Sequence, residues 1–505
     1  MVANVRSLGI SGIAGYAVQV ECFLSGGLPG FDIVGLGDTA VKEAKERVRA
    51  AVKNCGAKFP ISRITVNLAP ASQKKIGTFY DLPIFLAILA AGEEIPQPSE
   101  KMAFIGELSL SGEVRGVSGV LPAALAAVRE GIETLYVPQE NAAEASLAGG
   151  LTVYGVETAE QLLKHLRGEE TLVPAEKWVP TEEAGAQPDF DEVMGQENVK
   201  CALEVAAAGG HNILLIGAPG SGKSMLAKRL PSILPDLTER EALEATEIYS
   251  VAGLTDPKHP LLTTRPFRAP HHSSSAASLA GGGPLLRPGE ISLAHHGVLF
   301  LDELPEFRRD ALEILRQPIE EGEVTVVRAS GTLHLPSRFM LVCAMNPCRC
   351  GWYGHPSGRC SCSRKDVEKY VAKISGPLLD RIDLHIQVPS VEYDAMRRKS
   401  KPESSASVRA RVNAARERQA QRFAGTSVSC NADMTAEMVG RFCRLDDAGD
   451  RLMRDSFEKL GLTARSHDRI LRVARTIADL EGCENIEVPH LAEAIQYRNT
   501  DILKG

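Results

Sequence analysis

The chain has 505 residues, more than one hydrophobic core usually serves, so about two to four domains are expected. No apolar run reaches the ~18 residues of a membrane span, and the start lacks the charged and hydrophobic regions of a signal peptide. We therefore expect a soluble, cytoplasmic protein. The net charge of −7 excludes a surface that is basic throughout, but not nucleic acid bound at a local basic loop or in the pore of a ring.

Residues 1–167 alternate short strand-like runs with helical patterns. Residues 18–24 alternate as a strand does, and residues 82–91 form an apolar helix. Asp38 is placed to cap a helix over residues 41–55. The pattern predicts an α/β domain with a mixed order of strands and helices.

This first domain resembles the C-terminal domain of Lon proteases in three segments, residues 79–89, 104–132 and 135–141. Such enzymes use a lysine to deprotonate a serine nucleophile. The resemblance implies the serine where this chain has Phe79 or Tyr80, and the lysine where it has Ala123. We therefore expect a protease-like scaffold that lacks the Ser-Lys dyad and has no peptidase activity. The nearby groups that could restore such a pair are expected in a solvated loop: Ser72, Lys74 and Lys75.

Residues 168–188 are acidic, contain prolines and show neither a helical nor a strand period. Such a composition predicts a linker. Trp178 within it is expected to pack on a neighbouring domain rather than to contact a ligand.

The sequence GAPGSGKS follows an apolar run and precedes a helical pattern, which predicts a strand, a glycine loop and a helix. The backbone N–H groups of such a loop curl around a polyphosphate, and the positive end of the helix dipole points toward it. Lys223 can reach the β- and γ-phosphates, and the hydroxyl of Ser224 can bind Mg²⁺. The predicted ATP site comprises Gly217, Ala218, Pro219, Gly220, Ser221, Gly222, Lys223 and Ser224.

Residues 298–303, VLFLDE, form an apolar strand that ends in two carboxylates. At the carboxyl end of a strand beside the phosphate loop, Asp302 can hold Mg²⁺ through water or through Ser224. Glu303 can accept a proton from the attacking water. The alternative is a strand followed by a solvated acidic turn, but a phosphate loop requires an acid that holds the metal.

Four of the 11 cysteines are clustered as two C-x-C pairs, Cys348 with Cys350 and Cys360 with Cys362. The nine residues between the pairs contain three glycines and a proline, so the chain can fold back and bring the thiolates together. Four thiolates suit tetrahedral Zn²⁺, whereas iron–sulfur clusters usually have other spacings. Reduced surface thiols are the alternative, and His355 is a spare ligand.

Residues 189–390 resemble AAA+ ATPases of the magnesium-chelatase and replicative-MCM branch, with a DF-x-x-V-x-GQ segment at the start and LLDRID near the end. The resemblance implies that backbone groups near Val193 and Gly195 lie against the adenine. It also implies that Asn346 is a sensor between the acidic motifs and the γ-phosphate. Arg381 would then project into the neighbouring subunit's nucleotide site and neutralise charge there.

An internal salt bridge of Arg381 with Asp380 or Asp383 is the alternative. In this branch an insert and a hairpin before the sensor line the pore of a hexamer. Residues 265–297 and 320–339 carry that resemblance, the second with β-branched alternation and a turn near residues 329–331. The predicted contacts to a DNA backbone are Arg268, His271, His272 and Arg328, whose alternative roles are capping and hairpin structure.

Residues 391–505 are expected to form a helical lid. Residues 397–422 contain nine basic and two acidic residues, where a phosphate backbone would be attracted, although a solvated helical face is the simpler interpretation. Residues 462–482 resemble the lid of MCM and chelatase-type ATPases. The resemblance implies that Arg465 is a second sensor on the γ-phosphate, with Arg469 as the alternative.

The order of these parts resembles the YifB/ComM family from end to end. The expected fold is a Lon-like (ribosomal-protein-like) α/β domain, a parallel-sheet AAA+ domain with a pre-sensor hairpin, and a helical lid. The resemblance implies a homo-hexameric, ATP- and Mg²⁺-dependent DNA motor, linked to branch migration in recombination and natural transformation. Two alternatives are a magnesium-chelatase ATPase subunit that drives metal insertion and, less favoured, an ATP-dependent protease.

Overall fold

The computed structural model describes residues 1–180, 188–282, 287–328, 331–390, 402–460 and 462–498. The chain divides into two compact units, which are treated separately below. The first comprises Met1–Glu182, Glu239–Leu262 and Gly283–Pro288, and the second contains the remaining residues. The first unit therefore includes helix α8 (Glu239–Ala252), which follows the phosphate loop in the sequence.

A seven-stranded mixed sheet forms the centre of the first unit. The strands at residues 2–11, 14–25 and 63–69 are antiparallel neighbours, with Val5 opposite Val20, and all other neighbouring strands of this sheet are parallel. A small hairpin, β6 (Glu107–Leu108) with β7 (Val114–Arg115), lies outside this sheet. The strand order is β3 (Gly30–Val34), β4 (Arg63–Ala69), β2 (Ala14–Ser25), β1 (Val2–Ser11), β5 (Met102–Phe104), β8 (Thr134–Pro138) and β9 (Thr152–Val156).

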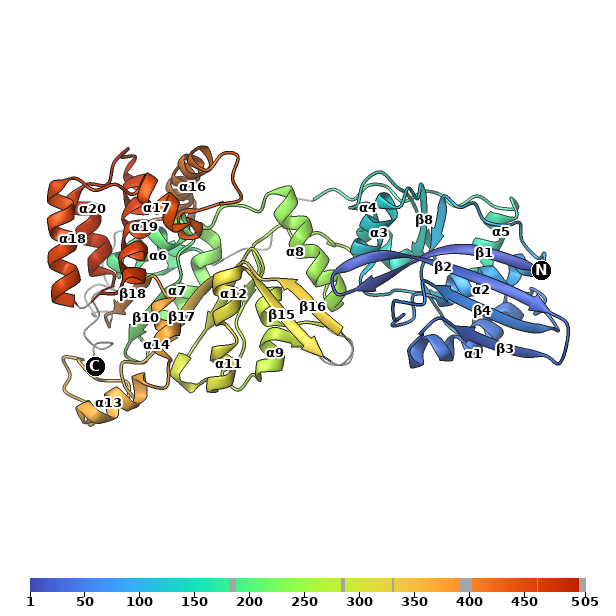
Figure 1. Ribbon diagram of the computed structural model, residues 1–505, viewed down its shortest axis with the longest axis horizontal. Coiled ribbons are helices and arrows are strands. Elements are labelled where there is room, and N and C mark those ends of the chain that lie inside the picture. The colour runs from blue at the N-terminus through green and yellow to red at the C-terminus, as the bar shows by residue number, and fades with distance from the viewer. Residues whose placement is uncertain (181–187, 283–286, 329–330, 391–401, 461, 499–505) are drawn as a thin grey trace. The chain divides into compact units, whose positions relative to one another are not determined.

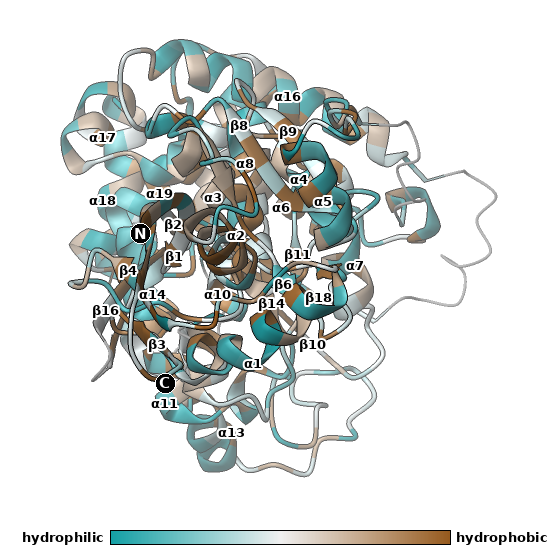
Figure 2. Cartoon of the chain, turned by 90° about the vertical axis from the view of Figure 1, so that its right-hand side faces the viewer, coloured by the Kyte–Doolittle hydropathy of each residue, from teal (hydrophilic) through white to brown (hydrophobic). Residues whose placement is uncertain are grey.

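Helix α2 (Asp81–Ala91) is apolar along its length and almost wholly buried, as its brown colour in Figure 2 reflects. Its one acid, Asp81, is paired with Arg47 at 2.6 Å, which satisfies a carboxylate that burial would otherwise destabilise. Asp38 caps α1 by accepting the N–H of Val41 at 2.9 Å. The remaining bounds are α1 (Thr39–Asn54), α3 (Val120–Arg129), α4 (Ala142–Ser146) and α5 (Ala159–Leu166).

Helix α8 is attached to the first unit through a buried polar contact. Ser250 donates a hydrogen bond to Glu144, which also accepts the N–H of Leu121 at the start of α3. Nearby, the indole N–H of Trp178 donates to the carbonyl of Lys258 at 3.0 Å. The segment after the phosphate-loop helix therefore contributes to the first unit's core, a connection that no local sequence pattern indicates.

The second unit is built on a five-stranded parallel sheet. Every residue of β10, β14 and β17 is buried, as expected for parallel strands covered on both faces. This confirms the predicted AAA+ type of α/β sheet with a phosphate loop. The strand order is β11 (Phe267–Arg268), β14 (Val298–Leu301), β17 (Met340–Met345), β10 (Ile213–Gly217) and β18 (Leu384–Val388).

The hairpin of β15 (Glu323–Arg328) and β16 (Gly331–Pro336) belongs to this unit, with Val326 opposite Leu333. The turn expected at its tip lies outside the described residues at 329–330. Short helices surround the sheet (Figure 1). They are α6 (Glu197–Gly209), α7 (Lys223–Arg229), α9 (Ala276–Ala280), α10 (Glu290–Leu293), α11 (Arg309–Glu313), α12 (Arg316–Glu321), α13 (Arg364–Val371) and α14 (Gly376–Asp380).

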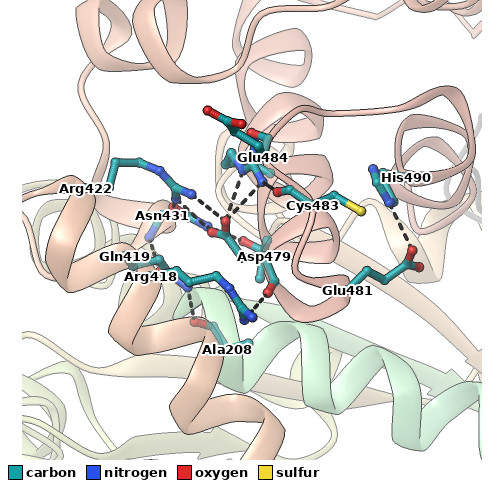
Figure 3. Close-up of polar contacts among 12 residues, drawn as sticks. Ala208, Arg418, Gln419, Arg422, Asn431, Asp479, Glu481, Cys483, Glu484 and His490 are labelled. Atoms are coloured by element: carbon teal, nitrogen blue, oxygen red, sulfur yellow. Dashed lines mark hydrogen bonds and ion pairs between the residues drawn. The ribbon is translucent and has the colours of Figure 1, made fainter.

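The helical C-terminal region forms a bundle, coloured orange to red in Figure 1, that packs α16 and α19 on α6. Its polar core is shown in Figure 3, where arginines surround the buried carboxylate of Asp479. No helix among the described residues is long and apolar enough to cross a membrane. The bundle comprises α16 (Ser405–Arg422), α17 (Ala436–Phe442), α18 (Asp447–Leu460), α19 (Ala464–Glu481) and α20 (Val488–Gln496).

The structure corrects one expectation about basic residues and qualifies another. Lys75, expected in a solvated loop, is fully buried and donates to the carbonyl of Pro70, while Ser72 and Lys74 are exposed. The α16 arginines remain exposed or half-exposed, as a solvated face predicts, but they also contact protein acceptors. For example, Arg411 binds Glu204 and Arg416 binds the carbonyl of Ala207. The four basic residues at 397–401 lie outside the described residues.

Candidate nucleotide site

The phosphate loop connects strand β10 to helix α7. Gly220 and Gly222 have φ values of 78° and 88°, which residues other than glycine rarely adopt. A Cβ at Gly217 would lie 2.5 Å from the carbonyl oxygen of Val388 in the adjacent strand. The glycines are therefore required by the turn of the loop and by its close packing on the sheet.

The ammonium group of Lys223 is held inside the loop. It donates to the carbonyls of Gly217 and Ala218 at 2.8 and 2.9 Å and to Asn346 Oδ1 at 3.3 Å. Burial lowers its pKa, although the charge of Asp302 opposes that change. The structure thus brings together the predicted phosphate lysine and the predicted sensor asparagine, which are 123 residues apart.

Ser224 and Asp302 lie side by side at the end of strand β14. The Ser224 hydroxyl donates to Asp302 Oδ2 at 2.6 Å, and Asp302 Oδ1 accepts the N–H of Glu303 at 2.9 Å. A hydroxyl and a carboxylate at this separation are hard oxygen donors that fit adjacent positions around Mg²⁺. The residues present therefore suit the ATP-bound metal that the sequence implies.

Glu303 follows with a left-handed backbone, φ 53°, and an exposed carboxylate. Its Oε2 lies 3.0 Å from Nδ1 of His272. His272 is among the predicted DNA contacts, and nothing in its local sequence pattern indicates a place beside the predicted base. A left-handed conformation is costly for a non-glycine residue, and such strain gathers at functional sites.

Gln196 is a site residue that lies in the DF-x-x-V-x-GQ segment but is not among the predicted site residues. Its amide Nε2 donates to the carbonyl of Ser221 at 2.6 Å and to that of Pro389 at 3.1 Å. It follows directly on Gly195, whose φ is 68°, and on the buried Val193. Gln196 thereby ties the segment predicted to lie against the adenine to the phosphate loop. The signal in the sequence that could have found it is its position directly after Gly195 in the DF-x-x-V-x-GQ segment.

Arg381 and Arg465, the two arginines predicted to act on a nucleotide, both lie near Glu320. Arg381 is only 5% exposed, forms an ion pair with Glu320 and donates to the carbonyl of Pro377 at 2.7 Å. The pKa of Glu320 is lowered, mainly by the Arg381 hydrogen bond and also by the charge of Arg465. In the described part of the chain, no hydrogen bond or ion pair joins either arginine to the phosphate loop.

The internal salt bridge weighed for Arg381 is thus real, but its partner differs from the expected Asp380 or Asp383. Asp383 pairs with Arg469 at 3.0 Å and accepts the N–H of Asn212 at 3.0 Å. Burial raises its pKa, but His211 and Arg469 outweigh burial and hold it below its usual range. Arg469, the alternative second sensor, is therefore engaged at the opposite end of β10 from the phosphate loop.

Of the three remaining predicted DNA contacts, the structure describes the side chains of Arg268 and His271 but not that of Arg328. Arg268 makes a bidentate pair with Glu290 at 2.7 and 2.8 Å, and His271 contacts the hydroxyl of Ser273 at 2.8 Å. Both side chains thus have polar partners within the protein, and their contact with DNA stays a prediction. Arg328 ends strand β15, and its side chain lies outside what the structure describes.

The positions predicted to take the place of a Lon-type dyad, Phe79 or Tyr80 and Ala123, are all buried, Tyr80 with 1% of its surface exposed. Phe79 is 7% exposed and packs in the apolar core, and Ala123 is fully buried in α3. Neither side chain has a nucleophile or a base.

Comparisons with known proteins agree with this arrangement. Models for subunit ChlI of magnesium chelatase match residues 20–141, 189–396 and, for its C-terminal part, 402–498. Competence protein ComM of Haemophilus influenzae is 44% identical over 98% of this chain and 97% of its own length. Protein YifB of Escherichia coli is 42% identical over 97% and 96%. An archaeal Lon protease of Methanothermobacter thermautotrophicus is 41% identical over 77 residues, 15% of this chain and 11% of its own.

The fold and the phosphate-loop site define a magnesium-chelatase-like AAA+ ATPase. Within that class, the chain belongs to the YifB/ComM family.

Proposed function

We propose that the chain is the subunit of a cytoplasmic, homo-hexameric DNA motor that uses ATP hydrolysis to move branched DNA during recombination, including natural transformation. The observation that carries the proposal is the position of the β15–β16 hairpin between the two halves of the nucleotide site. The hairpin lies after Asp302 and Glu303 in the sequence and leads into β17, which ends at Met345, directly before Asn346. A displacement at the γ-phosphate can therefore reach the hairpin through one strand.

The hairpin is amphipathic in the way such a coupling element requires. Val324, Val326 and Leu335 are buried on one face, whereas Val327 on the other is 64% exposed. Its base is fastened by the N–H of Ser337, which donates to the carbonyl of Gly322 at 2.8 Å. In this proposal the buried face transmits force from the ATPase core and the exposed face meets DNA, with Arg328 as the last residue of β15.

In the proposed hydrolysis step, Lys223 neutralises charge on the β- and γ-phosphates, and Asn346 senses the γ-phosphate through its contact with Lys223. Mg²⁺, held by Ser224 and Asp302, supplies charge neutralisation at the phosphates. Glu303 takes a proton from the attacking water, oriented by His272 at 3.0 Å. Arg381 and Arg465 complete the site, Arg381 from the neighbouring subunit.

The experiment is to measure ATP turnover with single-stranded, duplex and forked DNA, while a labelled Holliday-type substrate reports strand movement. We expect forked DNA to stimulate turnover and strand movement to require ATP, with Lys223→Ala inactive in both assays. Arg328→Ala should weaken DNA binding and reduce the slope of log affinity against log salt by about 1. The matched control, Arg364→Ala, removes an exposed arginine that pairs with Glu368 on α13. Turnover that is indifferent to every DNA contradicts the motor and favours the chelatase-type alternative.

A further inference from the structure

The two C-x-C pairs converge beside the phosphate loop. The Sγ atom of Cys348 lies 3.2 Å from that of Cys350 and 3.8 Å from that of Cys360, and Cys350 and Cys360 are 3.6 Å apart. Cys362 completes the group, and all four sulfur atoms lie within 4.8 Å of one another. All four cysteines are free thiols.

These separations are those of a tetrahedral metal site. With Zn–S bonds of about 2.3 Å, the sulfur atoms of a Zn-Cys₄ centre are about 3.8 Å apart. A disulfide needs a sulfur–sulfur distance of about 2.05 Å, far shorter than any separation here. We propose that Cys348, Cys350, Cys360 and Cys362 bind one structural Zn²⁺ per chain.

Both ends of the cluster are fixed by regular structure. Cys348 is fully buried just beyond strand β17, and Cys362 directly precedes the N-cap of helix α13. That cap is a capping box in which the Ser363 N–H donates to Asp366 at 3.0 Å and the Asp366 N–H donates to Ser363 at 3.3 Å. A site between two anchored ends loses little entropy on binding a metal.

The loop that connects the two C-x-C pairs is held by its own contacts, and these engage His355, the spare ligand. Trp352 contacts His355 edge to face at 4.9 Å, and the Arg359 guanidinium lies 5.1 Å from the centre of the Trp352 ring. Both ring nitrogens of His355 are engaged, with Ser357 at 2.7 Å and Ser390 at 3.0 Å. His355 is therefore a loop residue, and the ligand set is four thiolates.

The metal site also supports the nucleotide site, a consequence that rests on the proposed ATPase function. Gly351 sits inside the cluster with φ 87°, and a Cβ there would lie 2.6 Å from the ring of Pro219 in the phosphate loop. The same Cβ would lie 3.9 Å from Asn346, whose side-chain oxygen accepts a hydrogen bond from the Lys223 ammonium. Zn²⁺ would thus fix the surface on which the phosphate loop and its sensor rest.

The first test is metal analysis of the full chain purified without chelator under reducing conditions. We expect about one zinc per chain, and after removal of the metal, uptake of one Co²⁺ with the intense visible and thiolate charge-transfer bands of a tetrahedral CoS₄ centre. Iron with sulfide in place of zinc overturns the proposal. Wild-type protein that holds no metal, and takes up neither Zn²⁺ nor Co²⁺ when reduced, overturns it as well.

Variants test the ligand set. Cys350→Ser and Cys360→Ser, one from each pair, should each lower Zn²⁺ affinity by at least ~100-fold, because three thiolates no longer close the tetrahedron. Cys201→Ser is the matched control, since Cys201 is an exposed free cysteine elsewhere in the second unit. Equal zinc content in the control and in both ligand variants would contradict the assigned ligands.

Gly351→Ala tests the link to the nucleotide site without touching a thiol. We expect it to retain zinc while its affinity for a fluorescent ATP analogue falls about tenfold or more, since Pro219 must move. Gly358→Ala, in the same loop with open space around it, is the control for left-handed strain alone. Wild-type protein that holds one zinc per chain but shows no ATP turnover would refute the ATPase proposal and leave the zinc site standing. Wild-type protein that holds no zinc but shows full ATP turnover would refute the zinc site and leave the ATPase proposal standing.

Discussion

The nucleotide site and the polar core of the lid are both built from buried charges, yet they use them differently. In the lid, Asp479 is fully buried and accepts hydrogen bonds from Arg422, Arg475 and Asn431 (Figure 3). In the nucleotide site, Lys223 is 8% exposed and donates to two carbonyls and an amide. The lid's charges are thus closed on one another, whereas the lysine has only neutral hydrogen-bond partners.

The partners of a buried charge therefore distinguish a charge that stabilises the fold from one that can bind a ligand. A buried carboxylate surrounded by arginines has its strongest partners already, so an incoming anion gains little there. A buried ammonium held by neutral oxygens keeps its charge for a polyphosphate. This is also why the arginine-lined cavity of the lid, about 390 Å³ and bordered by Arg418, Arg422 and Arg475, is not the nucleotide site.

Arg381 is the residue that could break this comparison, because it has features of both groups. It is buried and paired like the lid arginines, but its partner Glu320 is half exposed and can be exchanged. We predict that Arg381→Ala lowers kcat by about 10³–10⁵-fold, the range for an arginine that acts on a neighbouring phosphate. The measurement is steady-state ATP turnover, with Arg364→Ala as the control for loss of a surface arginine.

Mixing decides whether Arg381 acts in trans. Arg381→Ala subunits keep an intact phosphate loop, and Lys223→Ala subunits keep an intact arginine, so a mixture should regain activity. If the mixture stays inactive and Arg381→Ala lowers the free energy of unfolding, Arg381 belongs with the structural arginines of the lid.

The Glu303→Gln variant tests the nucleotide site, where Glu303 is the predicted base. Glutamine keeps the size of the side chain but cannot accept a proton, so we expect turnover to fall by about 10²–10⁴-fold. Because Lys223, Ser224 and Asp302 are unchanged, the affinity for ATP should stay near that of the wild type. Glu306→Gln, in the same turn and paired with Lys373 at the surface, should leave turnover unchanged. Retained hydrolysis in Glu303→Gln would remove Glu303 as the base.

Much of the fold could be predicted because its signals are local. The apolar run before the glycine loop and the helical pattern after it lie within twenty residues of one another, and β10 and α7 occupy those positions. The strand predicted at residues 298–303 ends earlier, since β14 stops at Leu301 and Glu303 turns into the left-handed region. Asp302 therefore meets Ser224 from a turn rather than from the strand itself.

What sequence reasoning missed are contacts between residues far apart in the chain. Gln196 binds the loop 25 residues away, His272 meets Glu303 from the insert, and Glu320 meets Arg381 across 61 residues. No periodicity indicates which distant charge a side chain will meet. The burial of Lys75 was hidden for the same reason, because its backbone pairs with Leu36 and Asp38, which lie far from it in the sequence.

Asp479→Ala tests the structural half of the comparison. It leaves Arg475, 2% exposed, and Arg422 without their carboxylate, so the free energy of unfolding should fall by about 3–5 kcal/mol. Affinity for ATP, measured at a temperature where the variant is folded, should match the wild type. Asp455→Ala on the exposed face of α18 should change stability by less than about 0.5 kcal/mol. If Asp479→Ala were as stable as this control but lost ATP binding, the division between closed and available charges would fail, because the lid's carboxylate would then serve the nucleotide.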